Sequence, residues 1–380
     1  MSSSKHLPLN HATWVRMRLC GISVKTEIIL PEWTTFQTPF EDLTASVHIE
    51  KKLNRAIIAG RTLANTPAFR AVRIADGCVG FAPPSQNSLP CITATSDYRL
   101  ITIYESDSEK NGEFIRIPLE CRFVHEGVLS LHAACVEEGG RAVCFTGDSG
   151  IGKSTRAKAW AEALGAEFIS GDRPAIRLEA DGCTACGVPW DGKEQIFRNV
   201  ERPLHAILEV RRAPFTRLRR LTQEQAYRAL IRQCFIPMWD ADTAALAMAN
   251  VRRLCRSTPV YRMFADPSKE AALETHRTLF ERPEEIQEEL PEMKIREGFT
   301  LRNVADEFIV MPTGENIAKF EGAVVLSDVA AFVFEQLKRP VSREDLLALV
   351  LAEFEVDEST ASADLDALLA QFREMELLEE

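Results

Sequence analysis

The sequence predicts an α/β protein in three parts: a β-rich N-terminal domain, a central α/β domain and a small C-terminal winged-helix-like domain. Short apolar runs separated by turn signals occupy residues 20–119. A glycine-rich motif then stands between an apolar strand and an amphipathic helix. Residues 299–372 show three strand-like runs followed by three helices. We place the domains at 1–120, 121–281 and 293–380, with a linker at 282–292.

The composition is that of a soluble globular chain. Its 380 residues exceed what one hydrophobic core usually holds, and 46% hydrophobic with 27% charged residues is an ordinary globular balance. No apolar run approaches the ~20 residues of a membrane span, and the first residues lack the apolar core of a secretory signal. A net charge of −11 disfavours phosphate-backbone binding. We therefore expect a cytoplasmic protein that binds neither membranes nor nucleic acid.

The N-terminal region alternates apolar runs with turns and contains no catalytic motif. Asp76-Gly77 is a hairpin signal, because both residue types tolerate a positive φ. The predicted strands are Ile22–Leu30, Ala45–Glu50, Phe69–Phe81, Tyr98–Glu105 and Glu113–Leu119.

The central region begins with two buried strands, Leu129–Val136 and Arg141–Thr146, followed by one helix and further strands. Gly165 is a natural C-cap for that helix, and Asp181-Gly182 predicts a second hairpin. The apolar face of the helix consists of Ala157, Trp160, Ala161 and Leu164.

The strongest chemical signal is a P-loop. The motif runs Gly147-Asp148-Ser149-Gly150-Ile151-Gly152-Lys153-Ser154 and fits GxxxxGK[ST] at every fixed position. We expect the main-chain amides of this loop and of Thr155 to bind nucleotide phosphates, Lys153 to neutralise the β- and γ-phosphates, and the Ser154 hydroxyl to bind Mg²⁺. The alternative is a glycine-rich turn without a ligand. P-loops also serve ATPases, GTPases and transporters, so the surroundings must decide the reaction.

Those surroundings resemble the HPr kinase/phosphorylase superfamily, whose P-loop fold is related to that of ATP-dependent phosphoenolpyruvate carboxykinase. The resemblance covers residues 120–280 and implies an HPr-kinase-like P-loop domain that uses ATP and Mg²⁺. Relatives in this family are often oligomeric, which leaves a homo-oligomer open. Besides the P-loop, the matching stretches are Leu131–Val136, Phe168–Asp172, Gly187–Lys193 and Pro259–Arg262.

The resemblance implies a catalytic set of His132, Asp172 and Lys153. His132 would position or tune the site, and Asp172 would accept the proton of the attacking hydroxyl or help Ser154 hold Mg²⁺. The family commonly has two adjacent aspartates where this chain has Gly171-Asp172, so the division between base and metal ligand stays open. The alternatives are a hydrogen-bonded histidine at a strand start and an aspartate that caps a turn or helix. Lys193 either contacts phosphate or substrate or is solvated.

The signature of HPr kinase/phosphorylases is not evident downstream, so neither HPr as substrate nor phosphorolysis is inferred. Cys183 and Cys186 have CxxC spacing without a second pair, which favours two residues on a strand over a metal or redox site. The arginine-rich stretch is interpreted as a solvated loop, and the alternative is a receiver of phosphate or of an acidic peptide. It comprises Arg211, Arg212, Arg217, Arg219 and Arg220.

The C-terminal region predicts a winged-helix-like module. Ser342 with Asp345 three residues later suggests a capping box, in which each side chain accepts the other's backbone N–H. The expected strands are Phe299–Val304, Phe308–Met311 and Ile317–Leu326, and helices follow at Val329–Leu337, Ser342–Leu351 and Asp364–Phe372.

This module resembles the PqqD family, whose members recognise peptides in the biosynthesis of ribosomally made, modified peptides. The resemblance implies that residues 293–380 capture the leader of a precursor peptide as an added strand near Lys319–Leu326, beside the helix near Leu365–Phe372. A winged helix can also bind DNA. However, this region has eight Lys or Arg against nineteen Asp or Glu, which favours a peptide.

Three functions are compatible with these features. The first is an ATP-dependent kinase for a Ser or Thr of a precursor peptide held by its leader, since tethering raises the effective acceptor concentration. The second is a kinase for a small metabolite or a folded protein. The third is an ATP-responsive peptide chaperone that transfers no phosphate.

Overall fold

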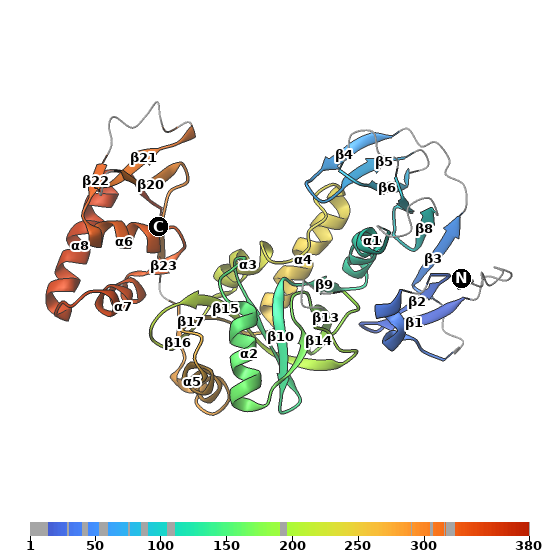
Figure 1. Ribbon diagram of the computed structural model, residues 1–380, viewed down its shortest axis with the longest axis horizontal. Coiled ribbons are helices and arrows are strands. Elements are labelled where there is room, and N and C mark those ends of the chain that lie inside the picture. Colours follow the sequence, from blue (N-terminus) through green and yellow to red (C-terminus); the bar gives the residue numbers. More distant parts are fainter. Residues whose placement is uncertain are drawn as a thin grey trace, which may run out of the picture. The chain divides into compact units, whose positions relative to one another are not determined.

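The protein is described from a computed structural model (Figure 1). It forms two compact units: Met1–Arg211, Leu221–Met263 and Pro267–Arg277 make up unit 1, and Arg212–Arg220, Phe264–Asp266 and Thr278–Glu380 make up unit 2. Within the described ranges, no helix combines the length and apolarity needed to cross a membrane. The residues described are 14–28, 30–39, 45–52, 60–74, 77–84, 90–104, 111–190, 196–289, 291–304, 307–314, 316 and 324–379.

The N-terminal part of unit 1 is a sheet with strand order β1-β2-β3-β8-β7-β6-β5-β4. Its core includes Trp33 and Phe36 from a short 3-10 helix, η1 (Pro31–Phe36), and Phe81 from the sheet, all almost fully buried. The β-rich character is confirmed. The strands are β1 (Val15–Leu19), β2 (Ile22–Thr26), β3 (Val47–Lys52), β4 (Arg61–Asn65), β5 (Arg70–Arg73), β6 (Val79–Ala82), β7 (Ile92–Ala94) and β8 (Leu100–Tyr104).

The strand predicted at Glu113–Leu119 is wrong, because this segment lies in helix α1 (Asn111–His125). Its apolar side chains point to nearly every side of the helix, and Phe114, Ile117 and Leu119 are all buried. A helix enclosed on all sides has no polar face, so its sequence lacks the 3.6-residue period that identifies a surface helix.

The central part of unit 1 is a mixed sheet with the path β12-β10-β11-β15-β14-β13-β9, and β17 also pairs with β15. Strand β11 enters the P-loop and runs parallel to β15, with Thr146 level with Glu209. The strands are β9 (Val128–Ser130), β10 (Ala133–Glu138), β11 (Arg141–Thr146), β12 (Glu167–Ser170), β13 (Ala175–Glu179), β14 (Gly182–Cys186), β15 (Glu201–Arg212) and β17 (Val260–Ala265).

Helix α2 (Lys153–Leu164) leaves the P-loop and packs against β10 and β11 (Figure 1). Of the predicted face, Ala157 and Trp160 are buried, and Ala161 and Leu164 are half-buried. The Trp160 ring lies 5.4 Å from that of Phe145. Gly165 ends the helix with φ +72°, and its N–H donates to the carbonyl of Ala161. Only strands are predicted after this helix, whereas the structure also has three helices there: α3 (Gln223–Ile231), α4 (Ala241–Ser257) and α5 (Lys269–Phe280).

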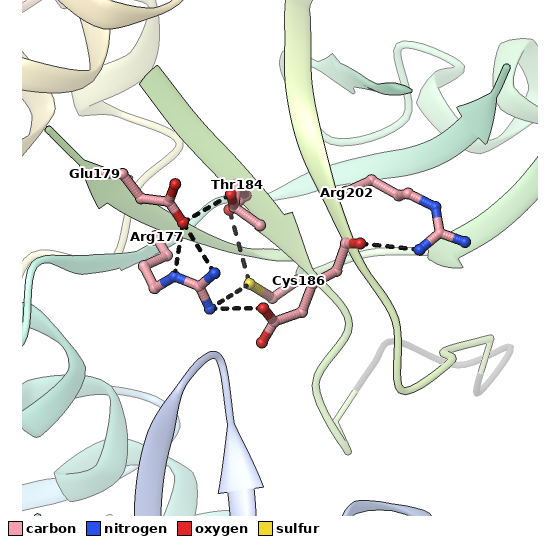
Figure 2. Close-up of polar contacts among 6 residues, drawn as sticks. Arg177, Glu179, Thr184, Cys186 and Arg202 are labelled. Carbon is pink, nitrogen blue, oxygen red and sulfur yellow. Dashed lines mark hydrogen bonds and ion pairs between the residues drawn. The ribbon is translucent and has the colours of Figure 1, made fainter. Parts of the chain in front are cut away.

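The predicted hairpin at Asp181-Gly182 joins β13 to β14 and is confirmed. Figure 2 shows the polar contacts on this hairpin. Arg177 donates to Glu179 on the same strand (Nε–Oε1 3.0 Å) and to Glu201 of β15 (Nη1–Oε2 2.8 Å), and so ties β13 to β15. Cys183 and Cys186 lie on β14 as buried free thiols, and burial raises the pKa of Cys183. Cys183 therefore behaves as a small hydrophobe rather than as a nucleophile.

Unit 2 contains the three-stranded sheet β20-β21-β22 and a smaller sheet, β23-β19-β24. Helices α6, α7 and α8 begin at side-chain caps, in which Ser327, Ser342 and Asp357 accept the N–H three residues ahead. The three strands and three helices are confirmed; residues 317–323 of the third predicted strand lie outside the described residues. The elements are β19 (Glu292–Ile295), β20 (Phe299–Val304), β21 (Glu307–Pro312), β22 (Val324–Leu326), α6 (Asp328–Gln336), β23 (Val341–Ser342), α7 (Arg343–Glu353), α8 (Glu358–Glu374) and β24 (Leu378–Glu379).

The stretch predicted as a linker, 282–292, contains a 3-10 helix, η4 (Pro283–Glu285), and strand β18 (Gln287–Glu288). Strand β18 pairs in parallel with β16 (Arg217–Arg220), also in unit 2. The three-domain division itself stays a prediction.

The arginine-rich stretch predicted to be a solvated loop is instead strand β16 together with the end of β15. Arg219 is buried and donates to Glu344 (Nη2–Oε1 2.6 Å), and Arg217 donates to Asp345 (Nη1–Oδ1 2.6 Å). Two carboxylates of the first turn of α7 therefore neutralise these arginines, and such pairing is what permits a guanidinium to be buried.

The capping box at Ser342 forms differently from the prediction. The Ser342 hydroxyl accepts the N–H of Asp345 (3.1 Å) and donates to the Asp345 carboxylate (2.8 Å). The fully buried carboxylate thus bonds the serine hydroxyl as well as Arg217.

We expect Asp345→Ala to destabilise unit 2 by about 2 kcal/mol, because Arg217 and the Ser342 hydroxyl both lose a buried hydrogen-bond acceptor. Hydrogen exchange of the α7 amides in the full chain checks this. Asp366→Ala is the matched control: Asp366 also pairs with an arginine, Arg343 (2.6 Å), but is 58% exposed, so little change is expected. Equal loss of protection in both variants would contradict the prediction.

Candidate functional site

The P-loop connects β11 to α2 and is shaped by glycines. Gly147 has φ +134° and Gly152 has φ +103°, a region that L side chains rarely adopt. A Cβ at Gly152 would also lie 2.5 Å from Arg156 Nη1. Gly152 is the N-cap of α2 and brings no side chain to cap the helix. The first N–H groups of a helix have no partner within the helix, so this end is suited to binding an anion.

Lys153 is the first residue of α2 and is buried at the loop. Its ammonium donates to the carbonyl oxygens of Gly147 (3.1 Å) and Asp148 (3.2 Å). Burial lowers the pKa of Lys153, while the carboxylates of Asp172 and Asp148 oppose this effect. The Lys153 ammonium thus lies at the P-loop, as the motif predicts.

Asp172 and His132 meet beside the P-loop. Asp172 follows β12, and its main-chain oxygen accepts the N–H of Ala133 (2.8 Å), which aligns it with the start of β10. His132 Nε2 lies 3.3 Å from Asp172 Oδ1, and Arg173 Nε lies 3.5 Å from Oδ2. The Ser154 hydroxyl is 3.5 Å from the carbonyl of Gly171. Three segments that are separate in sequence therefore meet at one place in unit 1.

The hydrogen bond from His132 holds the pKa of Asp172 below its usual range; burial opposes this, and Arg173 and Lys153 add to it. The carboxylate is therefore ionised at neutral pH. It can orient a hydroxyl group and receive its proton, close to an ammonium that can neutralise phosphate.

His132 is oriented from its other ring nitrogen, since Nδ1 lies 3.2 Å from Gln233 Oε1. The backbone repeats this contact, because the N–H of His132 donates to the carbonyl of Gln233 (2.8 Å). Gln233 is 101 residues away along the chain and was not predicted from the sequence. No local pattern could have shown it.

Glu209 forms ion pairs near the P-loop that were not predicted from the sequence. It stands on β15, level with Thr146 just before the P-loop, and its carboxylate accepts from Arg211 (2.8 Å) and from Arg262 Nη2 (2.9 Å). Arg262 is buried, in the stretch recognised only as a closing strand. The sequence signal that could have indicated these ion pairs is an acidic residue within the apolar run of β15.

The stretch Gly187–Lys193 is only partly described. The indole ring of Trp190 lies 5.6 Å from the Phe123 ring, so this tryptophan packs against α1. Residues 191–195, including Lys193, lie outside the described residues, and the role suggested for Lys193 stays a prediction.

Ser154 and Asp172 are the protein groups that could hold a divalent cation. Among the described residues there is no group of three or more His, Cys, Asp or Glu that could bind a metal. Mg²⁺ differs from metals with a full protein ligand set, because it usually keeps several waters and binds through one or two protein oxygens plus phosphate. A hydroxyl and a carboxylate beside the P-loop fit that requirement.

Comparison with known proteins identifies the C-terminal part of the chain. Residues 307–378 match the model of the family described as "Coenzyme PQQ synthesis protein D (PqqD)". The chain thus contains a PqqD domain, within unit 2. A comparison with curated protein sequences found no match.

Two solved structures show a likeness at low identity. One is TbiB1 in complex with the TbiA(beta) leader peptide, with 23% identity over 23% of this chain and 94% of that chain, and a TM-score of 0.20. The other is the Hpr(Ser) kinase/phosphatase from Coxiella burnetii, with 13% identity over 41% of this chain and 95% of that chain, and a TM-score of 0.23. Because both scores are below 0.5, we rely on the site geometry and the PqqD match instead.

Proposed function

We propose that this protein is an ATP- and Mg²⁺-dependent kinase that phosphorylates a Ser or Thr hydroxyl of a ribosomally made precursor peptide, whose leader binds to the PqqD domain. One observation carries the proposal. A P-loop lysine and an ionised aspartate, itself bonded to a histidine, lie together in unit 1 of a chain that also has a PqqD domain.

In this proposal each protein group has a role in phosphoryl transfer. The amides of residues 147–155 would bind the phosphates, and Lys153 would neutralise charge on the transferred group. The acceptor oxygen attacks the γ-phosphorus, the bond from that phosphorus to the bridging oxygen breaks, and ADP leaves. Asp172 takes the acceptor's proton. Bound at Ser154 and Asp172, Mg²⁺ would supply further charge neutralisation.

The lowered pKa of Asp172 is compatible with this role. The transition state of phosphoryl transfer is loose in most analyses, so the acceptor needs orientation more than a strong base. A carboxylate that stays ionised always presents an acceptor for the hydroxyl hydrogen. His132, which is oriented by Gln233, holds the Asp172 carboxylate in place.

The leader would bind as an added strand. In the described part of the sheet β20-β21-β22, strands β20 and β22 are the edges. Val325 of β22 is an exposed apolar side chain, 59% accessible, and Met311 of β21 is 43% accessible. In the register Ile309 lies opposite Val325, so Val325, Ile309 and Met311 share one face of the sheet.

The test incubates the purified chain with γ-labelled ATP and the short peptides encoded beside its gene. Label on a Ser or Thr of a peptide supports the proposal. Transfer that is equally fast with the leader removed would indicate a metabolite or protein kinase. Peptide affinity that changes with ATP without any labelled peptide would indicate a chaperone.

We expect Val325→Glu to weaken leader binding about tenfold, because a buried valine contributes ~1.5 kcal/mol or more and 1.4 kcal/mol is a factor of ten. Fluorescence anisotropy of a labelled leader peptide measures it. Val304→Glu is the matched control on the other edge strand, where Val304 is 52% exposed. If Val304→Glu weakens binding and Val325→Glu does not, the leader uses β20 and the predicted edge is wrong.

We expect His132→Ala to move the acid limb of kcat/KM to higher pH. The hydrogen bond from His132 lowers the pKa of Asp172, so its loss raises that pKa. The carboxylate is active above its pKa and is protonated below it; a raised pKa therefore extends the inactive range upward. His48→Ala, on β3, is the control. If the acid limb does not move in His132→Ala, ionisation of Asp172 does not control the observed pH profile.

A further inference from the structure

A pocket of about 440 Å³ lies beside His132 in unit 1. This is within the range of ~300–1,000 Å³ typical of ligand sites. None of residues 147–155, all of them described, lines it, so it is distinct from the phosphate-binding loop. The residues that line it include Phe69, His132, Arg173, Arg232, Phe235 and Trp239.

The apolar wall of the pocket comes from two distant parts of the chain. Phe69 belongs to the turn between β4 and β5, and Phe235 and Trp239 belong to the segment between α3 and α4. The Phe69 and Trp239 rings are 5.1 Å apart at 83°, and those of Phe235 and Trp239 are 5.8 Å apart at 67°. Edge-to-face contacts of this kind fix ring positions. The N-terminal sheet therefore builds part of the pocket.

The same segment is attached to the residues between β9 and β10, where His132 lies. The N–H of Phe235 donates to the carbonyl of Ser130 (3.0 Å), and His132 bonds Gln233 through its backbone and its ring. The apolar wall and the histidine are thus held by one hydrogen-bonded ladder. A side chain bound in the pocket would have a defined position relative to Asp172, 3.3 Å from His132.

The charged groups of the pocket are cationic. Arg232 is exposed, and no ion pair to it is found within the described part of the chain. Arg173 is 32% exposed and contacts Asp172. No Asp or Glu is among the described residues that line the pocket. Guanidinium groups beside an aromatic wall favour a carboxylate next to an apolar side chain.

We propose that this pocket binds the residues flanking the acceptor hydroxyl, and that it selects a large apolar or aromatic side chain together with an acidic one. This inference rests on the proposed kinase function and gives the N-terminal domain a role in substrate selection. Nucleotide is bound at the P-loop, the acceptor segment at the pocket, and the His132–Asp172 pair at their junction. The occupant is a peptide segment, because an apolar anchor and a carboxylate on one short chain match both walls.

The experiment uses a peptide library with a fixed central Ser, in which one flanking position is varied at a time. The peptides are supplied at about millimolar concentration, which replaces the effective concentration that leader tethering would give. Transfer of γ-labelled phosphate by the full chain is measured. We expect Asp or Glu to exceed Lys about tenfold at one flanking position, and a large apolar residue to exceed Gly at another.

Arg232→Glu should abolish or reverse the acidic preference. Arg228→Glu is the matched control: Arg228 lies on α3, is 66% exposed and does not line the pocket, so the preference should stay. Phe69→Leu should weaken the apolar preference. Affinity for a fluorescent ATP analogue, measured in all variants, should be unchanged, which shows that the P-loop remains folded.

The outcomes separate the pocket from the kinase function. Label transfer without any flanking preference, or with a preference that Arg232→Glu leaves intact, overturns the pocket assignment and leaves the kinase standing. A wild-type chain that binds nucleotide but labels no peptide overturns the proposed function, and the inference falls with it. If Arg228→Glu also loses the acidic preference, the assignment is overturned. The preference would then depend on the overall charge of the protein and not on the pocket.

Discussion

Lys153→Met is expected to lower the rate of phosphate transfer about 10²–10³-fold, the cost of removing one preorganised charge-stabilising donor from an active site. The ammonium is buried at the loop and bonds the carbonyls of Gly147 and Asp148. Methionine has a similar length and keeps the packing, but it cannot neutralise charge on the transferred phosphoryl group. Single-turnover transfer of γ-labelled phosphate measures the effect.

The control for this variant is Lys158→Met, five residues later on the same helix and exposed. It removes the same charge without touching the loop, so transfer should stay near wild type. Transfer by Lys153→Met at the wild-type rate would remove the P-loop from the reaction. A lower transfer rate in both variants would indicate that a disturbed helix α2, rather than loss of the Lys153 ammonium, slows the reaction.

Asp172→Asn is expected to reduce transfer about 10²–10⁴-fold, the range for loss of a positioned general base. Asparagine matches the carboxylate in shape and keeps an oxygen toward His132, so the fold should be retained. What it loses is the negative charge and the capacity to take a proton. Nucleotide affinity should hold or rise, because a negative charge near the phosphates is removed.

The same variant tests the second role of Asp172. If its carboxylate also holds Mg²⁺, the Mg²⁺ concentration for half-maximal transfer should rise in Asp172→Asn. If that concentration is unchanged, the carboxylate serves proton transfer alone. Asp181→Asn, in the exposed β13–β14 turn, is the control for a neutralised aspartate. Wild-type transfer by Asp172→Asn would refute the catalytic assignment.

The elements predicted correctly are those whose signals lie within a few residues. The P-loop needs glycines at fixed positions and a lysine at the next helix start, all within eight consecutive residues. The C-cap at Gly165, the Ser342 hydroxyl that accepts the Asp345 N–H, and the hairpin at Gly182 are equally local. Such features reflect backbone conformations that only certain residue types adopt, so the sequence alone identifies them.

The errors have a common physical cause. Helix α1 is enclosed on all sides and lacks an amphipathic period, so its sequence predicts a strand. The arginine-rich stretch predicts a loop, because its partners, Glu344 and Asp345, are about 125 residues away. Burial on every side and a distant counter-charge are both tertiary properties. Neither property can be predicted from the residues that are adjacent in the sequence.

The sequence by itself identified the P-loop motif between a strand and a helix, the β-rich start and the PqqD-like end. Only the tertiary structure decided that Asp172 meets His132, that Gln233 orients that histidine, and that Phe69 and Trp239 wall one pocket with Arg232. The reason is that loops and caps depend on backbone conformation within a few residues. A site depends on strand pairing and packing, which bring residues more than a hundred positions apart within hydrogen-bonding distance.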